Sequence, residues 1–98
     1  MELTEKQRRH LRGLGHKLKP VILVGQAGVS DAVAAETRAA LAAHELIKVR
    51  IGGLDRGERD EAFADLAART DSTIVSRIGH TALLYRQHPE KPRIQLPE

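Results

Sequence analysis

The segment Gly25-Gln26-Ala27-Gly28 is the part of this sequence best suited to binding chemistry, because it joins a short apolar run to a helical pattern. At the start of a helix, unpaired backbone N–H groups and the helix dipole favour an anion. Glycines at both ends let a phosphate approach the backbone without meeting a Cβ. No Walker Gly-Lys-Ser/Thr and no three-glycine dinucleotide fingerprint follows. The segment is therefore either a plain strand-to-helix turn, which this spacing more often means, or an anion-binding loop.

The residue types that commonly perform catalysis form no centre in this sequence. There is no Cys, which excludes a thiolate metal site, a thiol nucleophile and a disulfide. The five histidines are scattered without the spacing of metal ligands. Ser30 is better explained as a helix cap, and Asp60, Glu61 and Asp65 as an exposed acidic helix face. We expect a protein that is not an enzyme and takes no cofactor, metal or small-molecule substrate.

Charge is unevenly distributed along the chain. The 98 residues carry 16 Lys plus Arg and 13 Asp plus Glu, a formal charge of +3. Residues 1–19 hold six basic and two acidic side chains, whereas residues 53–71 hold three basic and six acidic ones. One positive face is typical of a protein that binds an anionic polymer, and an unevenly charged solvated surface explains the pattern equally well. With one Tyr, one Phe and no Trp, aromatic platforms for base stacking are nearly excluded.

The length and composition indicate one globular domain with a core of Leu, Ile, Val and Ala. No apolar run approaches the roughly 20 residues of a membrane helix, and the first residues contain no apolar signal region. We expect a cytoplasmic protein that does not contact a membrane.

Hydrophobic periodicity and capping patterns predict the element order α-β-α-β-α-β-β. The predicted elements are helices over about residues 4–15, 31–43 and 56–69, and strands over about 21–24, 46–51, 73–78 and 81–86. Such alternation implies a compact sheet with helices packed on at least one face.

Particular residues give these elements their expected orientation. Leu3, Leu11, Leu14 and Leu18 form a stripe on the first helix that we expect to face the core. The unbroken apolar run 21–24 predicts a strand buried on both faces.

Three further patterns predict which side chains point outward, where a hairpin turns and where the domain ends. Alternation over 46–51 predicts that Lys48 and Arg50 face outward. Gly79-His80 suits a two-residue hairpin turn. Three prolines after Gln87 predict an irregular tail, so we expect a domain over 1–87 and a Pro-rich tail over 88–98.

Three blocks of the sequence, in order, resemble the CRM domain and more closely its stand-alone bacterial form, the YhbY family. The blocks are LKPVILVGQAGV at 18–29, HELIKVR at 44–50 and IGHTALLYR at 78–86, and the opening LTEKQ and LRGL also fit. The resemblance runs from about residue 3 to residue 86. It implies an α/β fold, with a four-stranded mixed sheet and three helices, similar to the C-terminal domain of translation initiation factor three.

The resemblance also implies RNA binding and an association with precursor large ribosomal subunits. The family's glycine loop, likened to the backbone-clamping loop of KH domains, maps onto Gly25, Gln26, Ala27 and Gly28. Plant organelle members usually carry basic residues between the two glycines, whereas this chain has Gln26-Ala27, so flanking Lys and Arg must supply the charge. His80 stands where a Lys is common.

We therefore predict a monomeric RNA-binding protein whose partner is ribosomal RNA in a large-subunit precursor. The residues expected to contact RNA are Gly25, Gln26, Ala27, Gly28, Lys17, Lys19, Lys48, Arg50, Lys6, Arg8, Arg9, Arg12, Arg77 and Arg86. The alternative is a protein–protein adaptor that docks on an acidic ribosomal or assembly protein through the same basic surface.

Overall fold

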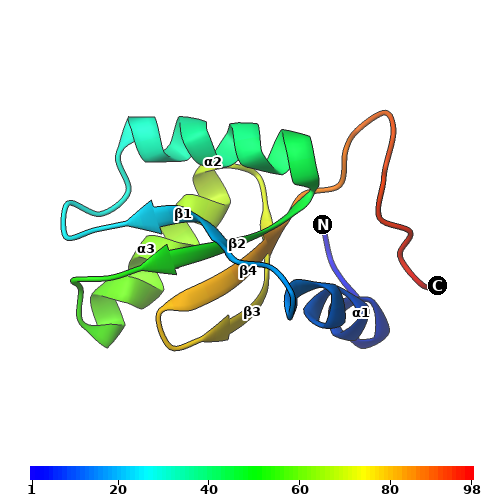
Figure 1. Cartoon of the computed structure of the whole chain (residues 1–98), viewed down its shortest axis with the longest axis horizontal. Coiled ribbons are helices and arrows are strands. Elements are labelled where there is room, and N and C mark those ends of the chain that lie inside the picture. Colours follow the sequence, from blue (N-terminus) through cyan, green and yellow to red (C-terminus); the bar gives the residue numbers. More distant parts are fainter.

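Seven elements follow one another in the predicted order α-β-α-β-α-β-β (Figure 1). The computed structural model describes all residues, 1–98. The elements are α1 (Glu5–Gly15), β1 (Pro20–Val24), α2 (Asp31–His44), β2 (Leu46–Ile51), α3 (Arg56–Arg69), β3 (Thr73–Ile78) and β4 (Thr81–Tyr85). Each lies within two residues of its predicted bounds, because side-chain caps mark the helix starts clearly.

The four strands form one mixed sheet in the order β1-β2-β4-β3. β1 and β2 are parallel and are connected through α2, whereas β4 is antiparallel to both β2 and β3. The turn at Gly79-His80 joins β3 to β4 as a hairpin, as predicted. The mixed four-stranded sheet with three helices is confirmed.

The larger part of the core lies between the sheet and the helices α2 and α3. Ile47, Val49 and Ile51 of β2 point into it, and Phe63 and Leu66 of α3 pack against them. All five side chains are fully or almost fully buried. Because side chains alternate along a strand, Lys48 and Arg50 must point to the other side of the sheet.

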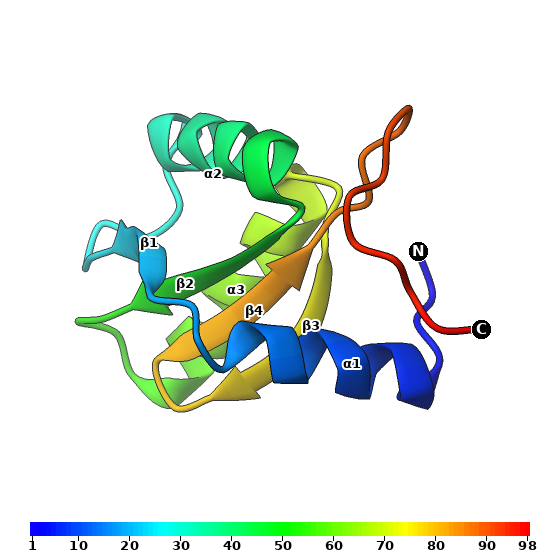
Figure 2. The same ribbon diagram turned by 45° about the vertical axis from the view of Figure 1, so that its right-hand side comes forward.

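A smaller core lies on that other side, beneath α1. It contains Leu11 of α1, Leu46, Val75, Leu83 and Tyr85. Figure 2 shows α1 in front of the sheet and α3 behind it. The sheet is thus covered by two helices on one side and by one short helix on the other.

Two predictions about burial are wrong, and both concern the side that α1 covers only in part. β1 is an edge strand, and its Val21 and Leu23 are 50% and 72% exposed. Leu14 at the end of α1 is 42% exposed, although Leu11 on the same stripe is buried. The apolar run 21–24 has the composition of a strand buried on both faces, but α1 packs mainly on β3 and β2 and leaves β1 uncovered.

The C-terminal segment 88–98 has no helix or strand, as predicted, but it is fastened to the domain. The carboxylate of Glu45, which is buried, accepts hydrogen bonds from the backbone N–H groups of His88, Arg93 and Ile94 at 2.7 to 2.8 Å. Ile94 also packs against the smaller core. Burial alone would raise the pKa of the Glu45 carboxyl, but the three N–H donors and the nearby charge of Arg93 hold that pKa below its ordinary value.

None of the three helices combines the length and the apolar character that crossing a bilayer requires.

Candidate nucleic-acid interface

The part of the sheet that α1 leaves uncovered forms a surface that we call the open face. Its residues are Val21, Leu23, Lys48, Arg50, Ile78 and Thr81. Strand alternation places all of them on the side opposite α2 and α3. Leu23 and Ile78 are 72% and 77% exposed, so the surface combines aliphatic groups with cations.

The open face and its border carry cations that no carboxylate neutralises. Lys48 and Arg50 stand on β2, and Lys17 and Lys19 lie in the linker that leads from α1 into β1. None of these four side chains takes part in an ion pair; the ion pairs of the protein all involve Arg12, Arg69 or Arg77. The structure therefore brings these four predicted residues together on one side of the molecule.

Arg77, by contrast, lies on the side of α2 and α3. Its position opposite Ala82 in the β3–β4 register puts its side chain on the α3 side. There the guanidinium stacks over the Phe63 ring, 5.0 Å from the ring centre, and pairs with Asp60. The structure does not bring Arg77 to the open face.

Arg86 is also remote from the glycine loop. It follows Tyr85, which pairs with Leu46 at the beginning of β2, whereas the loop lies where β1 and β2 end. Its backbone N–H donates to the carbonyl oxygen of Glu45 at 2.9 Å.

The predicted cations of α1 divide into two kinds. Lys6 and Arg9 are exposed and point away from the sheet. Arg8 donates to the carbonyl oxygens of Ile74 and Val75, both at 2.8 Å, and so covers the free edge of β3. Arg12 is half-buried and pairs with Glu5 at 3.3 Å. Arg8 is therefore committed to holding α1 on the sheet.

The glycine loop forms a tight turn at the end of β1. The N–H of Gly28 donates to the carbonyl oxygen of Gly25 at 3.0 Å, and Gly28 has φ 75°, a conformation that favours glycine. Gln26 and Ala27 at the tip are exposed. The loop therefore presents its backbone to solvent.

A second glycine pair, Gly52-Gly53, supports this loop, and the sequence patterns did not single it out. The N–H of Gly52 donates to the carbonyl oxygen of Val24 at 2.9 Å. Gly53 has φ 75°, and a Cβ there would lie 2.8 Å from Cγ and 3.3 Å from the backbone N of Gln26, so glycine suits the close packing of the two turns. The signal for this contact is the Gly-Gly that follows the alternating run 46–51.

The N-terminus of α2 is less available to an anion than the sequence suggests. The Ser30 hydroxyl accepts from the N–H of Val33 at 3.1 Å and caps the helix. Asp31 places the protein's own carboxylate in the first turn, where it pairs with Arg69. An anion at this end of the sheet would meet the turn Gly25–Gly28 rather than the helix terminus.

The hairpin turn between β3 and β4 reaches the same end of the sheet. Nδ1 of His80 lies 3.0 Å from the carbonyl oxygen of Ile51, and the N–H of Ile51 donates to the carbonyl oxygen of His80 at 2.8 Å. Three turns, at Gly25–Gly28, Gly52-Gly53 and Gly79-His80, therefore lie side by side beyond the ends of β1 and β2 (Figure 1).

The opposite side of the molecule has a different charge character. α3 carries Glu58, Asp60, Glu61 and Asp65. Glu58, Glu61 and Asp65 line a shallow depression together with Gln26 and Gly28 of the glycine loop. Beside the glycine loop, the charge therefore favours a polyanion on the side of the open face over the side of Glu58, Glu61 and Asp65.

This combination of fold and surface agrees with a match to the family model described as the CRS1 / YhbY (CRM) domain, which covers residues 3–86. The chain belongs to the CRM-domain family.

Relatives in several bacteria resemble the chain over almost its whole length. A protein of Haemophilus influenzae named as an RNA-binding protein is 41% identical over 97% of this chain and 95% of its own. A probable RNA-binding protein of Pseudomonas aeruginosa is 40% identical over 92% of this chain and 86% of its own. A Staphylococcus aureus protein described as a candidate RNA-binding protein has a solution structure that matches with a TM-score of 0.83 and 32% identity, covering 98% of this chain and all of that one.

Proposed function

We propose that this CRM-domain protein binds RNA and holds its phosphate backbone between the open face and the glycine loop. Three relatives from different bacteria carry RNA binding in their names, and a non-enzymatic binding role fits the same surface. Lys48 and Arg50 neutralise phosphates over the sheet, Lys17 and Lys19 extend the positive border, and the loop offers backbone N–H groups.

The observation that carries this proposal is that the cations on and beside the open face have no carboxylate partners. Lys17, Lys19, Lys48 and Arg50 take part in no ion pair. On the α3 side of the glycine loop, by contrast, the carboxylates of Glu58, Glu61 and Asp65 lie next to Gln26 and Gly28. This arrangement favours the approach of a polyanion to the loop from the open face.

Recognition on this surface relies on the backbone and shape of the RNA more than on stacked bases. Both aromatic residues are buried, Phe63 in the larger core and Tyr85 in the smaller one. The Tyr85 ring faces the interior beneath α1. Aromatic stacking, the usual device of single-strand binding surfaces, is thus missing from this one.

The biological target that we propose is ribosomal RNA in a precursor of the large subunit, bound by a monomer in the cytoplasm. This finer proposal rests on the family resemblance of the three sequence blocks. It is tested by crosslinking the protein to RNA in cells and sequencing the attached RNA. Recovery of fragments of large-subunit precursor RNA supports the assignment, and recovery of mainly messenger RNA contradicts it.

The role of the loop is tested by Gly25→Asp, with Gly25→Asn as the matched neutral control. A Cβ on Gly25 meets no atom within 4 Å, and its φ is not in the left-handed region, so both variants should fold. Gly28→Asp would be a poorer test, because Gly28 has φ 75°. We expect the carboxylate to weaken RNA binding about tenfold and the amide to leave it nearly unchanged. Equal affinities for the two variants would remove the loop from the binding surface.

The adaptor hypothesis keeps one observation in its favour. A groove of about 510 Å³ lies between the end of α1, the linker into β1 and the start of β2, and is lined by Leu14, Leu18, Val21 and Ile94 together with Lys17 and Lys19. An acidic, partly apolar protein segment could bind in this groove. RNA-independent copurification of an acidic ribosomal or assembly protein, lost in Val21→Glu, would favour the adaptor.

A further inference from the structure

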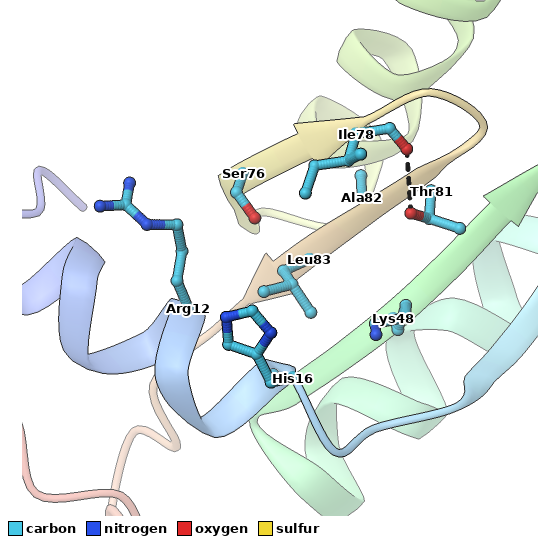
Figure 3. Close-up of a pocket in the computed structure, with 9 residues that line it drawn as sticks. Arg12, His16, Lys48, Ser76, Ile78, Thr81, Ala82 and Leu83 are labelled. Carbon is cyan, nitrogen blue, oxygen red and sulfur yellow. Dashed lines mark hydrogen bonds between the residues drawn. The ribbon is translucent and has the colours of Figure 1, made fainter.

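A hollow of about 90 Å³ opens on the open face, where the last turn of α1 meets the sheet (Figure 3). Arg12 and His16 of α1 lie on one side of it, and Lys48, Ser76 and Thr81 come from three different strands. Leu83 forms part of its wall, and none of the lining residues is acidic. The hollow is separate from the glycine loop, since no residue of the loop lines it.

The last turn of α1 rests on the Leu83 side chain of β4. A Cβ on Gly15 would lie 2.3 Å from Cδ1 of Leu83, so a larger residue at this position would displace the leucine side chain or the helix. Arg12 and His16 stand one helical turn apart and share a face of α1. The close contact at Gly15 thus brings both side chains to the border of the sheet.

Hydrogen-bond donors face the hollow without partners in the protein. Lys48 is half-buried and takes part in no ion pair. Neither the His16 ring nor the Ser76 hydroxyl is held by another group, whereas the Thr81 hydroxyl donates to the carbonyl oxygen of Ile78 at 3.1 Å. Arg12 shares its guanidinium with Glu5. Cationic and hydroxyl donors of this kind suit an oxyanion.

The size of the hollow, about 90 Å³, is compatible with a small anionic group. A single water needs roughly 10–15 Å³ of such space, so a tetrahedral phosphoryl group fits. The hollow is also open to solvent along the sheet, which lets a chain enter and leave it.

We propose that this hollow is a second phosphate-binding site, and that it takes an internal phosphodiester of the RNA strand whose backbone also meets the glycine loop. This inference rests on the proposed RNA binding. Gly52, which directly follows β2 and contacts the end of β1, lies four residues after Lys48, about 13 Å at a rise of ~3.3 Å per residue. Arg50 lies between them on the same side, so the three positions define a path for the RNA along β2.

The site is tested with Lys48→Gln and Ser76→Ala, against Lys91→Gln as a control that removes the same charge from the C-terminal segment. The probe is a short single-stranded RNA with a 5′-hydroxyl end, unmodified or with one phosphodiester at a time replaced by a neutral methylphosphonate. We expect Lys48→Gln to weaken binding about tenfold, Lys48→Arg to restore most of it, and Lys91→Gln to have no effect.

The methylphosphonate series separates a specific site from general attraction. At one linkage, the neutral replacement should weaken RNA binding by the wild-type protein. It should not weaken binding by Lys48→Gln, because that variant has already lost the contact between residue 48 and this phosphate. If every linkage weakens both proteins equally, the hollow holds no particular phosphate and the inference is wrong. If binding requires a 5′-phosphate end, the ligand is a terminal monoester and the inference is also wrong.

A gain of affinity gives an independent readout. Glu5→Gln removes the carboxylate that holds Arg12 at 3.3 Å, and we expect RNA binding to tighten several-fold as the guanidinium turns to the hollow. Unchanged or weaker binding by this variant contradicts the part assigned to Arg12. Wild-type protein that binds no RNA would overturn the proposed function itself. Wild-type binding with unaffected hollow variants would overturn the second site and the contact assigned to Lys48, but not RNA binding by the rest of the open face.

Discussion

At the scale of single residues, Glu45 has the most unusual position in the molecule. It follows α2 with φ 62°, a conformation uncommon for a residue other than glycine, and its side chain is buried. The buried carboxylate is satisfied by three backbone N–H groups between His88 and Ile94. Glu45 therefore fixes residues 88–94 to the domain, together with the packing of Ile94 and Leu96 on the smaller core.

Glu45→Gln should therefore loosen the C-terminal segment without unfolding the sheet. The amide has one acceptor oxygen and no charge, so it cannot replace the carboxylate in all three contacts. We expect the free energy of unfolding to fall by on the order of 2 kcal/mol, the scale for hydrogen bonds to a charged group. Amide hydrogen exchange should speed up at residues 88–94 first. Glu36→Gln, on an exposed position of α2, is the control and should change neither quantity.

The same carboxylate predicts how stability depends on pH. Its native pKa lies below the ordinary value of 4.5, so below that pH the unfolded chain binds the proton more readily than the folded one. The contribution of Glu45 is present above pH 4.5 and is lost as the pH falls through the lower native value. Urea unfolding of wild type and Glu45→Gln should therefore converge in acid. A stability difference that persists at the lowest pH would contradict this role.

At the scale of elements, the seating of α1 decides the shape of the open face. Two glycines, Gly13 and Gly15, lie near the end of this helix, and helix propensity alone treats both as weakening its last turn. In the structure their roles differ: a Cβ on Gly13 meets nothing within 4 Å, whereas one on Gly15 would overlap Leu83. Propensity alone could not separate them, because the close approach depends on a residue 68 positions away in the chain.

Gly13→Ala and Gly15→Ala should change stability in opposite directions. Alanine at position 13 should stabilise the protein by about 0.5–1 kcal/mol, the helix-interior difference between the two residues. Alanine at position 15 forces Leu83 or α1 to move, and we expect a loss of about 1–3 kcal/mol. Thermal or urea unfolding measures both. Equal effects of the two substitutions would show that α1 does not sit on Leu83 as described.

The sheet shows what periodicity can and cannot predict. Alternation over 46–51 placed Lys48 and Arg50 on the outer side correctly, since a period of two fixes which side chains share a face. The apolar run of β1 predicted burial on both faces, and this was wrong for Val21 and Leu23. Strand order and the limited reach of α1 decide that exposure, and neither is encoded in a four-residue pattern.

At the scale of the whole molecule, the basic residues 1–19 and the acidic residues 53–71 of the sequence correspond to two sides of the structure, but not every basic residue is available for binding. The basic first helix and the acidic third helix do lie on opposite sides of the sheet. Contacts across the fold decide which basic side chains remain available to a ligand. Arg77 pairs with Asp60, and Arg8 donates to carbonyl oxygens of β3, although both count as positive charges in the sequence. The charge pattern and the glycine loop were enough to predict roughly where the interface lies. Which basic residues belong to it depends on the order of the strands in the sheet, which the sequence does not reveal.

The central claim is that the open face binds the RNA backbone, and the affinity for RNA as a function of salt tests it most directly. Arg50→Gln and Lys91→Gln each remove one positive charge, but only Arg50 lies on the open face. For the wild type, the logarithm of the RNA affinity should fall linearly as the logarithm of the salt concentration rises. Arg50→Gln should lower the magnitude of that slope by about 1, whereas Lys91→Gln should keep the wild-type slope. Equal slopes for the two variants, or an affinity independent of salt, would contradict the claim.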